Sequence, residues 1–153
     1  DRTIQFERLV ESVTAMVQKA EELDAYVGIE AVTCHTMNSV DRTAQLIERI
    51  NSDHLKVILD PLNLIDFSNM NEQTRIYNEA INRYGDRIEA IHLKDGVYTK
   101  QGYTPKQLGT GIMEFTELFD WLKKEKPEIC ILREEMVLEN AMEDLKFMRK
   151  LIQ

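Results

Sequence analysis

The segment that most constrains the fold of this chain runs from Lys56 to Asn63 and reads Lys-Val-Ile-Leu-Asp-Pro-Leu-Asn. Its three aliphatic residues, two of them β-branched, are typical of a strand buried on both faces, as in a parallel sheet. Pro61 ends the strand because it has no backbone N–H to donate to a ladder. Asp60 therefore follows a buried strand, where an ionised carboxylate is unfavourable unless a metal, a cation or hydrogen bonds compensate it.

The same pattern occurs three more times, in apolar runs that end at Glu30, His92 and Glu134. The separations from Glu30 to Asp60, Asp60 to His92 and His92 to Glu134 are 30, 32 and 42 residues. A strand–helix unit takes roughly 30 residues, so each polar residue is expected at the same end of successive strands. Asp60 alone would be explained equally well as the cap of a turn. Three carboxylates and one imidazole that converge on one point predict a divalent metal site.

Apolar residues at helical spacing fill the segments between these strands. They predict helices over residues 3–23, from about 39 to 50, and over 69–84, 115–124 and 140–152, with Thr3 as the first N-cap. The glycine-containing segment 96–111 has no helical period and is expected to be an ordered or mobile loop. Alternation of helices and strands implies an α/β fold with parallel strands, either an open sheet or half of a (β/α)8 barrel. In both, ligands bind at the carboxyl ends of the strands.

Composition excludes several classes of function. A length of 153 residues fits one domain, residues 1–153, and a formal charge of −8 gives no basic face for nucleic acid or an anionic membrane. The apolar runs are strand-sized, so no transmembrane segment is expected. No G-x-G-x-x-G motif follows a strand, and Gly109-Thr110-Gly111 is too short to be a phosphate loop. Cys34 and Cys130 are expected to be buried or partly buried free thiols, which favours a cytoplasmic location.

Five short motifs together give the chain a family resemblance. They are Gly28-Ile29-Glu30, Leu59-Asp60-Pro61-Leu62-Asn63, Ile91-His92-Leu93-Lys94-Asp95, Gly109-Thr110-Gly111 and Leu132-Arg133-Glu134-Glu135. Through them the chain resembles the C-terminal half of the xylose isomerase-like (β/α)8 TIM barrels, in particular the sugar phosphate isomerase/epimerase branch. The resemblance covers essentially all residues and implies one divalent ion held by Glu30, Asp60, His92 and Glu134. Because a barrel takes about 250 residues, it also implies that the preceding four strands lie outside this chain.

The expected ligands favour Mn²⁺ or Mg²⁺, with Co²⁺ or Zn²⁺ as alternatives. Such an ion would chelate two oxygens of a ketose, polarise its carbonyl and stabilise an enediolate. Glu30 and Glu134 are then expected to remove and return the proton as a catalytic pair. The predicted activity is that of an isomerase or epimerase acting on a sugar, sugar phosphate or related polyol ketone.

Four further residues are expected to contact or orient the substrate, namely Asn63, His35, Lys94 and Asp95. Asn63 stands where many relatives carry a histidine three residues after the ligand aspartate. An amide can hydrogen-bond a substrate hydroxyl but does not titrate near neutral pH. Lys94 and Asp95 follow His92 closely enough to orient the substrate or the metal ligands.

Three alternatives stay open at this point. Glu135 competes with Glu134 for the metal, because strand alternation points only one of two neighbours inward. A trinuclear-zinc apurinic endonuclease on the same scaffold would need more than the three histidines present and a basic groove. A catalytically inactive half-barrel or binding module of the same fold would need neither a metal nor a complete pocket.

Geometry predicts that the chain associates with another chain. Four strands with helices on one face leave the other face and two edges without partners. In a whole barrel, layers of apolar side chains fill that inner face. The residues expected to supply them are Ile29, Val57, Leu59, Ile91, Cys130 and Leu132. We therefore expect a homo-oligomer, or pairing with the N-terminal half-barrel.

Overall fold

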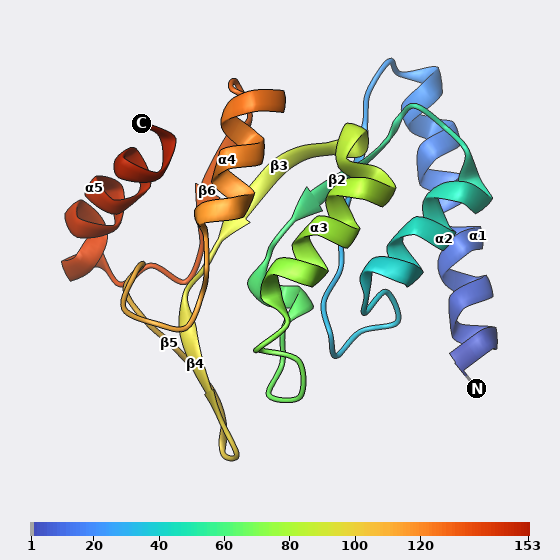
Figure 1. Ribbon diagram of the computed structural model, residues 1–153. Helices are drawn as coiled ribbons and strands as arrows, with labels where there is room; N and C mark the ends of the chain where they lie inside the picture. The colour runs from blue at the N-terminus through green and yellow to red at the C-terminus, as the bar shows by residue number, and fades with distance from the viewer. Residues whose placement is uncertain (1) are drawn as a thin grey trace.

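The computed structural model describes residues 2–153 and alternates helices with strands. The helices are α1 (Arg2–Glu22), α2 (Val40–Ile50), α3 (Gln73–Tyr84), α4 (Thr116–Glu125) and α5 (Ala141–Ile152). The strands are β1 (Val27–Glu30), β2 (Leu55–Leu59), β3 (Ile88–Leu93), β4 (Gly96–Thr99), β5 (Gly102–Pro105) and β6 (Cys130–Arg133). Short 3-10 turns lie at Leu62–Leu64, Gly85–Arg87 and Leu138–Asn140. Figure 1 shows this order from the N-terminal to the C-terminal end.

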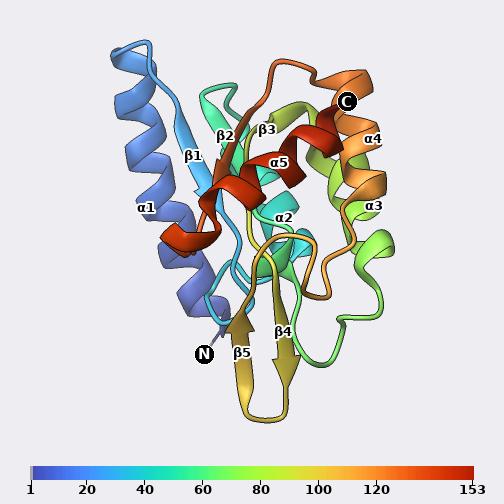
Figure 2. The ribbon, with the colours of Figure 1, turned by 90° about the vertical axis from the view of Figure 1, so that its left-hand side faces the viewer.

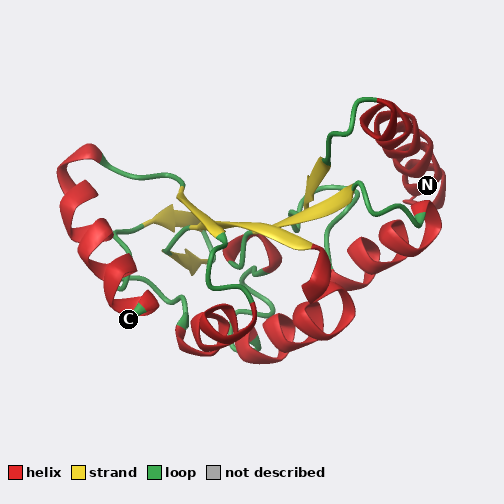
Figure 3. Ribbon diagram, turned by 90° about the horizontal axis from the view of Figure 1, so that it is seen from above, coloured by secondary structure: helices red, strands yellow, loops and turns green. Residues whose placement is uncertain are grey.

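Four of the strands form one parallel sheet in the order β1-β2-β3-β6. The helices cover one side of this sheet, and the whole assembly curves into a crescent when seen from above (Figure 3). The predicted α/β fold with parallel strands is therefore confirmed. After each of the first three strands, a helix carries the chain back to the end of the sheet where strands begin. All four strands therefore run in the same direction, and their carboxyl ends lie together.

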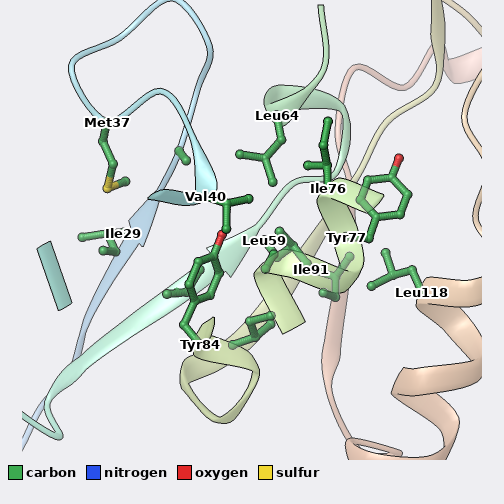
Figure 4. Packing of buried hydrophobic residues seen from close by; sticks show 14 of the residues in the cluster. Ile29, Met37, Val40, Leu59, Leu64, Ile76, Tyr77, Tyr84, Ile91 and Leu118 are labelled. Atoms are coloured by element: carbon green, nitrogen blue, oxygen red, sulfur yellow. The ribbon is translucent and has the colours of Figure 1, made fainter. Parts of the chain in front are cut away.

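The hydrophobic core lies between the sheet and the helices. Leu55, Val57 and Leu59 alternate with half-buried residues along β2, so one face of this strand packs on the helices. Leu59 and Ile91 lie beside the apolar side chains of α3 (Figure 4).

This packing corrects the expected inner-face residues. Ile29, Val57, Leu59 and Ile91 are buried in the core on the helix side. The strands place their bulkiest apolar residues against the helices, because that face has partners within this chain. Of the predicted set, Cys130 and Leu132 are exposed, and Leu132 keeps 51% of its surface in solvent.

A register shift in β3 positions His92. Val57 pairs with Ile88 but Ile58 pairs with Ala90, so β3 carries one extra residue at this point. Ile88 and Ile91, three residues apart, are therefore both fully buried against the helices. Strict alternation from Ile88 would turn His92 toward the helices as well. The bulge instead places His92 on the open face of the sheet.

The segment expected as a loop contains an antiparallel hairpin of β4 and β5. It extends beyond the carboxyl ends of the parallel strands, on the same side as the start of α1 (Figure 2). Tyr98 pairs with Tyr103 across the hairpin, and Gly102 has a φ of +120° at the turn. Tyr and Thr residues on both sides of this turn, with Val97 before it, were the signal that the loop prediction missed.

Three smaller expectations also need correction. Thr3 lies inside α1 and does not cap it, because the helix already includes Arg2. The third helix begins at Gln73, after turns in which the Asn69 side chain accepts a hydrogen bond from Asp66 N–H. Cys34 and Cys130 are free as predicted but exposed, because one lies in the loop after β1 and the other on the uncovered face of β6. Within residues 2–153, no helix has both the length and the apolar content needed to cross a bilayer.

Candidate metal centre

The structure brings Glu30, Asp60, His92 and Glu134 to one point. Glu30 is the last residue of β1, and Asp60 and Glu134 directly follow β2 and β6. His92 is the penultimate residue of β3. One ligand atom from each side chain lies within 4.8 Å of the others. The parallel sheet thus delivers three carboxylates and one imidazole to the same edge.

Two buried atoms in this cluster have no hydrogen bond within the described residues. They are Oδ2 of Asp60 and Nδ1 of His92. Nδ1 of His92 lies 3.4 Å from Oε2 of Glu30 and 3.0 Å from Oε1 of Glu134. Buried polar atoms are rarely left unpaired in native proteins. A cation at the centre would satisfy both atoms.

Asp60 is almost fully buried, with 1% of its surface exposed. Its Oδ1 accepts hydrogen bonds from the backbone N–H groups of Leu62 (3.0 Å) and Asn63 (3.2 Å). Burial raises the pKa of Asp60 from 3.8 to about 6, against the opposing effect of the nearby Lys94 charge. The negative charge of Asp60 is therefore unfavourable without further positive charge close by.

Lys94 supplies one positive charge at the edge of the cluster. Its Nζ lies 2.9 Å from Oε2 of Glu134, 3.1 Å from Oδ2 of Asp60 and 3.4 Å from Oδ1 of Asn63. Burial alone would lower the pKa of Lys94, but the hydrogen bond to Glu134 and the charge of Asp60 raise it overall. The hydrogen bond from Lys94 in turn lowers the pKa of Glu134. Lys94 thus keeps Glu134 ionised.

Asn63 and His35, both expected near the substrate, have different surroundings. The Asn63 amide donates a 2.7 Å hydrogen bond to Oε1 of Glu30 and so orients that carboxylate. His35 is exposed and lies outside the four-residue cluster, in the loop after β1. It lines a separate cavity.

Asp95, predicted to contact or orient the substrate, accepts hydrogen bonds from the backbone of its own chain. Its Oδ1 accepts from Gly96 N–H (2.8 Å) and Met113 N–H (3.1 Å), and its Oδ2 from Gly109 N–H (2.9 Å) and Gly111 N–H (3.0 Å). Four backbone donors occupy the acceptor sites of this buried carboxylate. The segment 109–111 therefore wraps a protein carboxylate, and a Cβ on Gly111 would lie 2.1 Å from Oδ1 of Asp95.

Sequence reasoning missed a buried ion pair between Arg133 and Asp144. Nε of Arg133 donates to Oδ2 of Asp144 at 2.8 Å, and their side chains are 7% and 2% exposed. Arg133 also donates to the carbonyl oxygens of Leu93, Lys106 and Glu134. This network fixes the end of β6, from which Glu134 projects. Asp144 lies on the inward side of α5, at helical spacing from Ala141 and Met148. A carboxylate among inward-facing residues of a helix was the sequence signal for a buried ion pair.

Glu134 and Glu135 point to different partners. Glu134 joins His92 and Lys94 in the cluster. Glu135 has a φ of +53° and accepts a 2.8 Å hydrogen bond from the hydroxyl of Tyr103 in the hairpin. The left-handed backbone at Glu135 turns its side chain away from the cluster.

The donor set and the two buried atoms without a hydrogen bond fit a divalent cation. Carboxylate oxygens and an imidazole nitrogen are hard to borderline ligands of the type that Mn²⁺, Mg²⁺, Co²⁺ and Zn²⁺ accept. The four side chains could therefore hold one metal ion.

Comparison with known proteins agrees with this architecture. The family model of the xylose isomerase-like TIM barrel matches residues 1–151. A xylose isomerase domain protein from Planctomyces limnophilus is 20% identical with a TM-score of 0.73, and the match covers 95% of this chain and 51% of that one. The IOLI protein with a bound zinc atom is 18% identical (TM-score 0.73; 99% and 56% covered). D-psicose 3-epimerase, crystallised in the presence of D-fructose, is 18% identical (TM-score 0.75; 99% and 58% covered). No curated protein matches the chain.

The chain spans about half the length of these solved structures. Its four parallel strands match part of a TIM barrel, as predicted from the βα repeats and the motif resemblance. The chain belongs to the xylose isomerase-like TIM barrel family.

Proposed function

We propose that this chain carries the metal centre of a divalent-metal-dependent isomerase or epimerase that acts on a sugar, sugar phosphate or related polyol ketone. The observation behind the proposal is a cluster of three carboxylates and one imidazole in which two buried atoms, Asp60 Oδ2 and His92 Nδ1, form no hydrogen bond among the described residues. Lys94 Nζ, 3.1 Å from Asp60 Oδ2, supplies one positive charge against these three carboxylates. Similarity to D-psicose 3-epimerase supports the same class of reaction.

Glu30, Asp60, His92 and Glu134 would hold the ion. We favour Mn²⁺ or Mg²⁺ from the oxygen-rich donor set, while the zinc in the IOLI structure keeps Zn²⁺ among the candidates. When bound, a divalent ion would polarise the substrate carbonyl and stabilise the charge of an enediolate.

Glu30 and Glu134 are our proposed residues for proton transfer. Both carboxylates lie close to His92 Nδ1, at 3.4 and 3.0 Å. One carboxylate would remove the proton from the carbon next to the carbonyl, and the other would return a proton to that or the adjacent carbon. Asn63 orients the Glu30 carboxylate, and Lys94 keeps Glu134 ionised.

An inactive half-barrel or binding module is the second candidate. It is favoured because the helices lie on one side of the sheet (Figure 3) and the chain spans about half the length of the solved structures it matches. The apurinic-endonuclease reading is weaker, because His92 is the single histidine in the cluster among residues 2–153.

We further propose that activity requires a second half-barrel, either the N-terminal half of the protein or another copy of this chain. Such a partner would cover the open face of the sheet, on which Cys130 and Leu132 of β6 are exposed. Two exposed free thiols fit a reducing compartment, so a cytoplasmic location is part of this proposal.

Calorimetric titration of the full 153-residue chain with Mn²⁺ tests the metal centre. One ion per chain is expected, and Asp60→Ala should weaken binding by more than about a hundredfold, since it removes a charged ligand. Asp86→Ala is the matched control because that side chain is 80% exposed. Equal affinities in the two variants would refute the metal centre.

Catalysis is tested separately, by incorporation of solvent deuterium into a panel of ketoses. The metal-loaded chain should catalyse exchange when the preceding half-barrel is supplied, and Glu30→Gln should suppress it. Metal binding without exchange into any ketose would favour the binding-module alternative.

A further inference from the structure

A cavity of about 560 Å³, separate from the metal centre, lies at the N-terminal ends of α1 and α2. Its volume falls within the range of small-molecule sites. Six polar residues of its lining carry the argument. They are Arg2, Gln5, His35, Thr36, Asn38 and Arg42. Because these residues come from α1, the loop after β1 and the first turn of α2, the cavity lies on the same side as the hairpin and the carboxyl ends of the strands (Figure 2).

This cavity has the opposite charge to the metal centre. Two guanidinium groups and one imidazole line it, and no Asp or Glu does so among the described residues. The chain as a whole has 27 acidic and 19 basic residues, so such a lining is unusual here. Asp41, next to Arg42 in sequence, is held elsewhere by Arg83 and Gln45, each at 2.7 Å.

The arginines are available to a ligand. Within residues 2–153, neither Arg2 nor Arg42 forms an ion pair with a carboxylate. The guanidinium of Arg42 stacks on the ring of Phe6 at 4.7 Å, and its one side-chain hydrogen bond, to Gln45, is long at 3.4 Å. Stacking holds the guanidinium plane while leaving its N–H edge free to donate.

A single residue connects this cavity to the metal centre. Thr33, in the cavity wall, donates its backbone N–H to the carbonyl oxygen of Asn63 at 2.9 Å. The Asn63 side chain in turn donates to Glu30. These two hydrogen bonds link the cavity wall to a side chain that orients Glu30 in the metal centre.

We propose that the cavity binds the phosphate group of a small phosphorylated molecule. Arg42 and Arg2 would donate charge-assisted, bidentate hydrogen bonds, and His35, Thr36 and Asn38 would supply the remaining donors. One part of the inference rests on the proposed function, namely that the substrate is a phosphorylated ketose and not a free one. A free phosphate that regulates the enzyme would use the same donors.

Inorganic phosphate is the first probe, titrated calorimetrically into the full metal-free chain. We expect saturable binding of one phosphate. Arg42→Gln should weaken it about tenfold or more through the loss of charge-assisted hydrogen bonds, and His35→Gln should weaken it severalfold. Arg75→Gln is the matched control, because Arg75 pairs with Glu72 and Glu79 on the exposed side of α3.

Mn²⁺ affinity, measured in the same variants, should stay unchanged, which also shows that they are folded. Phosphate affinity that is equal in the Arg42, His35 and Arg75 variants, or no phosphate binding at all, would overturn the inference. Loss of the metal centre alone would leave phosphate binding intact, so the two proposals fail separately.

A second experiment distinguishes the two sources of phosphate. D-fructose 6-phosphate and D-fructose are compared on the Mg²⁺-loaded chain. If the substrate carries the phosphate, the phosphorylated ketose should bind at least about tenfold more tightly, an advantage lost in Arg42→Gln and under competition from inorganic phosphate. If the phosphate is a free effector, inorganic phosphate should bind without competing with the ketose. Either result supports a phosphate site, whereas competition that persists unchanged in Arg42→Gln would place the phosphate elsewhere and contradict it.

Discussion

Replacing Asp60 with Asn should stabilise the metal-free chain while removing its affinity for divalent cations. Burial raises the pKa of Asp60 by about two units, from 3.8 to about 6, and each unit corresponds to about 1.36 kcal/mol. The ionised carboxylate therefore destabilises the folded state by about 3 kcal/mol near neutral pH. Asn keeps an oxygen to accept the N–H groups of Leu62 and Asn63, and Lys94 keeps Glu134 as a partner. We expect a gain of up to about 3 kcal/mol in the free energy of unfolding.

The stability difference between the Asp60→Asn variant and the wild-type chain should depend on pH. Because the folded state holds the Asp60 proton to higher pH than the unfolded state does, this residue makes the wild-type chain less stable as pH rises from about 4 to about 6. The Asn variant lacks that contribution, so its advantage should be absent near pH 4 and complete near pH 7. Urea denaturation followed by circular dichroism in EDTA measures the difference between the two proteins. An Asn variant that is less stable at pH 7, or an advantage that does not change with pH, would refute the reasoning.

Three further predictions concern the supports of the site. Asp144→Ala leaves the buried Arg133 without its carboxylate and should lower the free energy of unfolding by about 3–5 kcal/mol. Replacing both residues by apolar ones of similar volume should lower it less, and urea denaturation of the two variants checks this. Gly111→Ala places a Cβ 2.1 Å from Oδ1 of Asp95 and should destabilise the chain by about 1–3 kcal/mol. Residues 106–113 should then be less protected in hydrogen exchange, and wild-type protection there would contradict the role given to Asp95. The exposed Leu132 and the open sheet edges should drive self-association at micromolar concentration, and a stable monomer in sedimentation would contradict that expectation.

The strands and their polar ends could be predicted because each is a local pattern. An apolar run followed by Asp60 and Pro61 indicates a strand and its end without reference to any other part of the chain. Spacing near the length of one strand–helix unit then places Glu30, Asp60 and His92 at one edge. The convergence of these side chains follows from the parallel topology alone.

The features that sequence reasoning missed depend on contacts between distant segments. The bulge that turns His92 to the open face is a property of the pairing of β3 with β2. Asp95 resembles a substrate-facing residue by its position after His92, but its four backbone donors come from its neighbour Gly96 and from residues 109–113. The direction of Ile29 and Leu59 was misjudged because alternation identifies two faces without saying which one the helices cover.

Anomalous diffraction from crystals soaked in Mn²⁺ tests the central claim most directly. We predict one anomalous peak per chain, with distances of about 2.0–2.3 Å to side-chain atoms of Glu30, Asp60, His92 and Glu134. Lys94 Nζ should then move away from Asp60, because the ion takes over the charge compensation it now provides. A peak elsewhere, or no peak at saturating Mn²⁺, would contradict a metal centre built from these four residues.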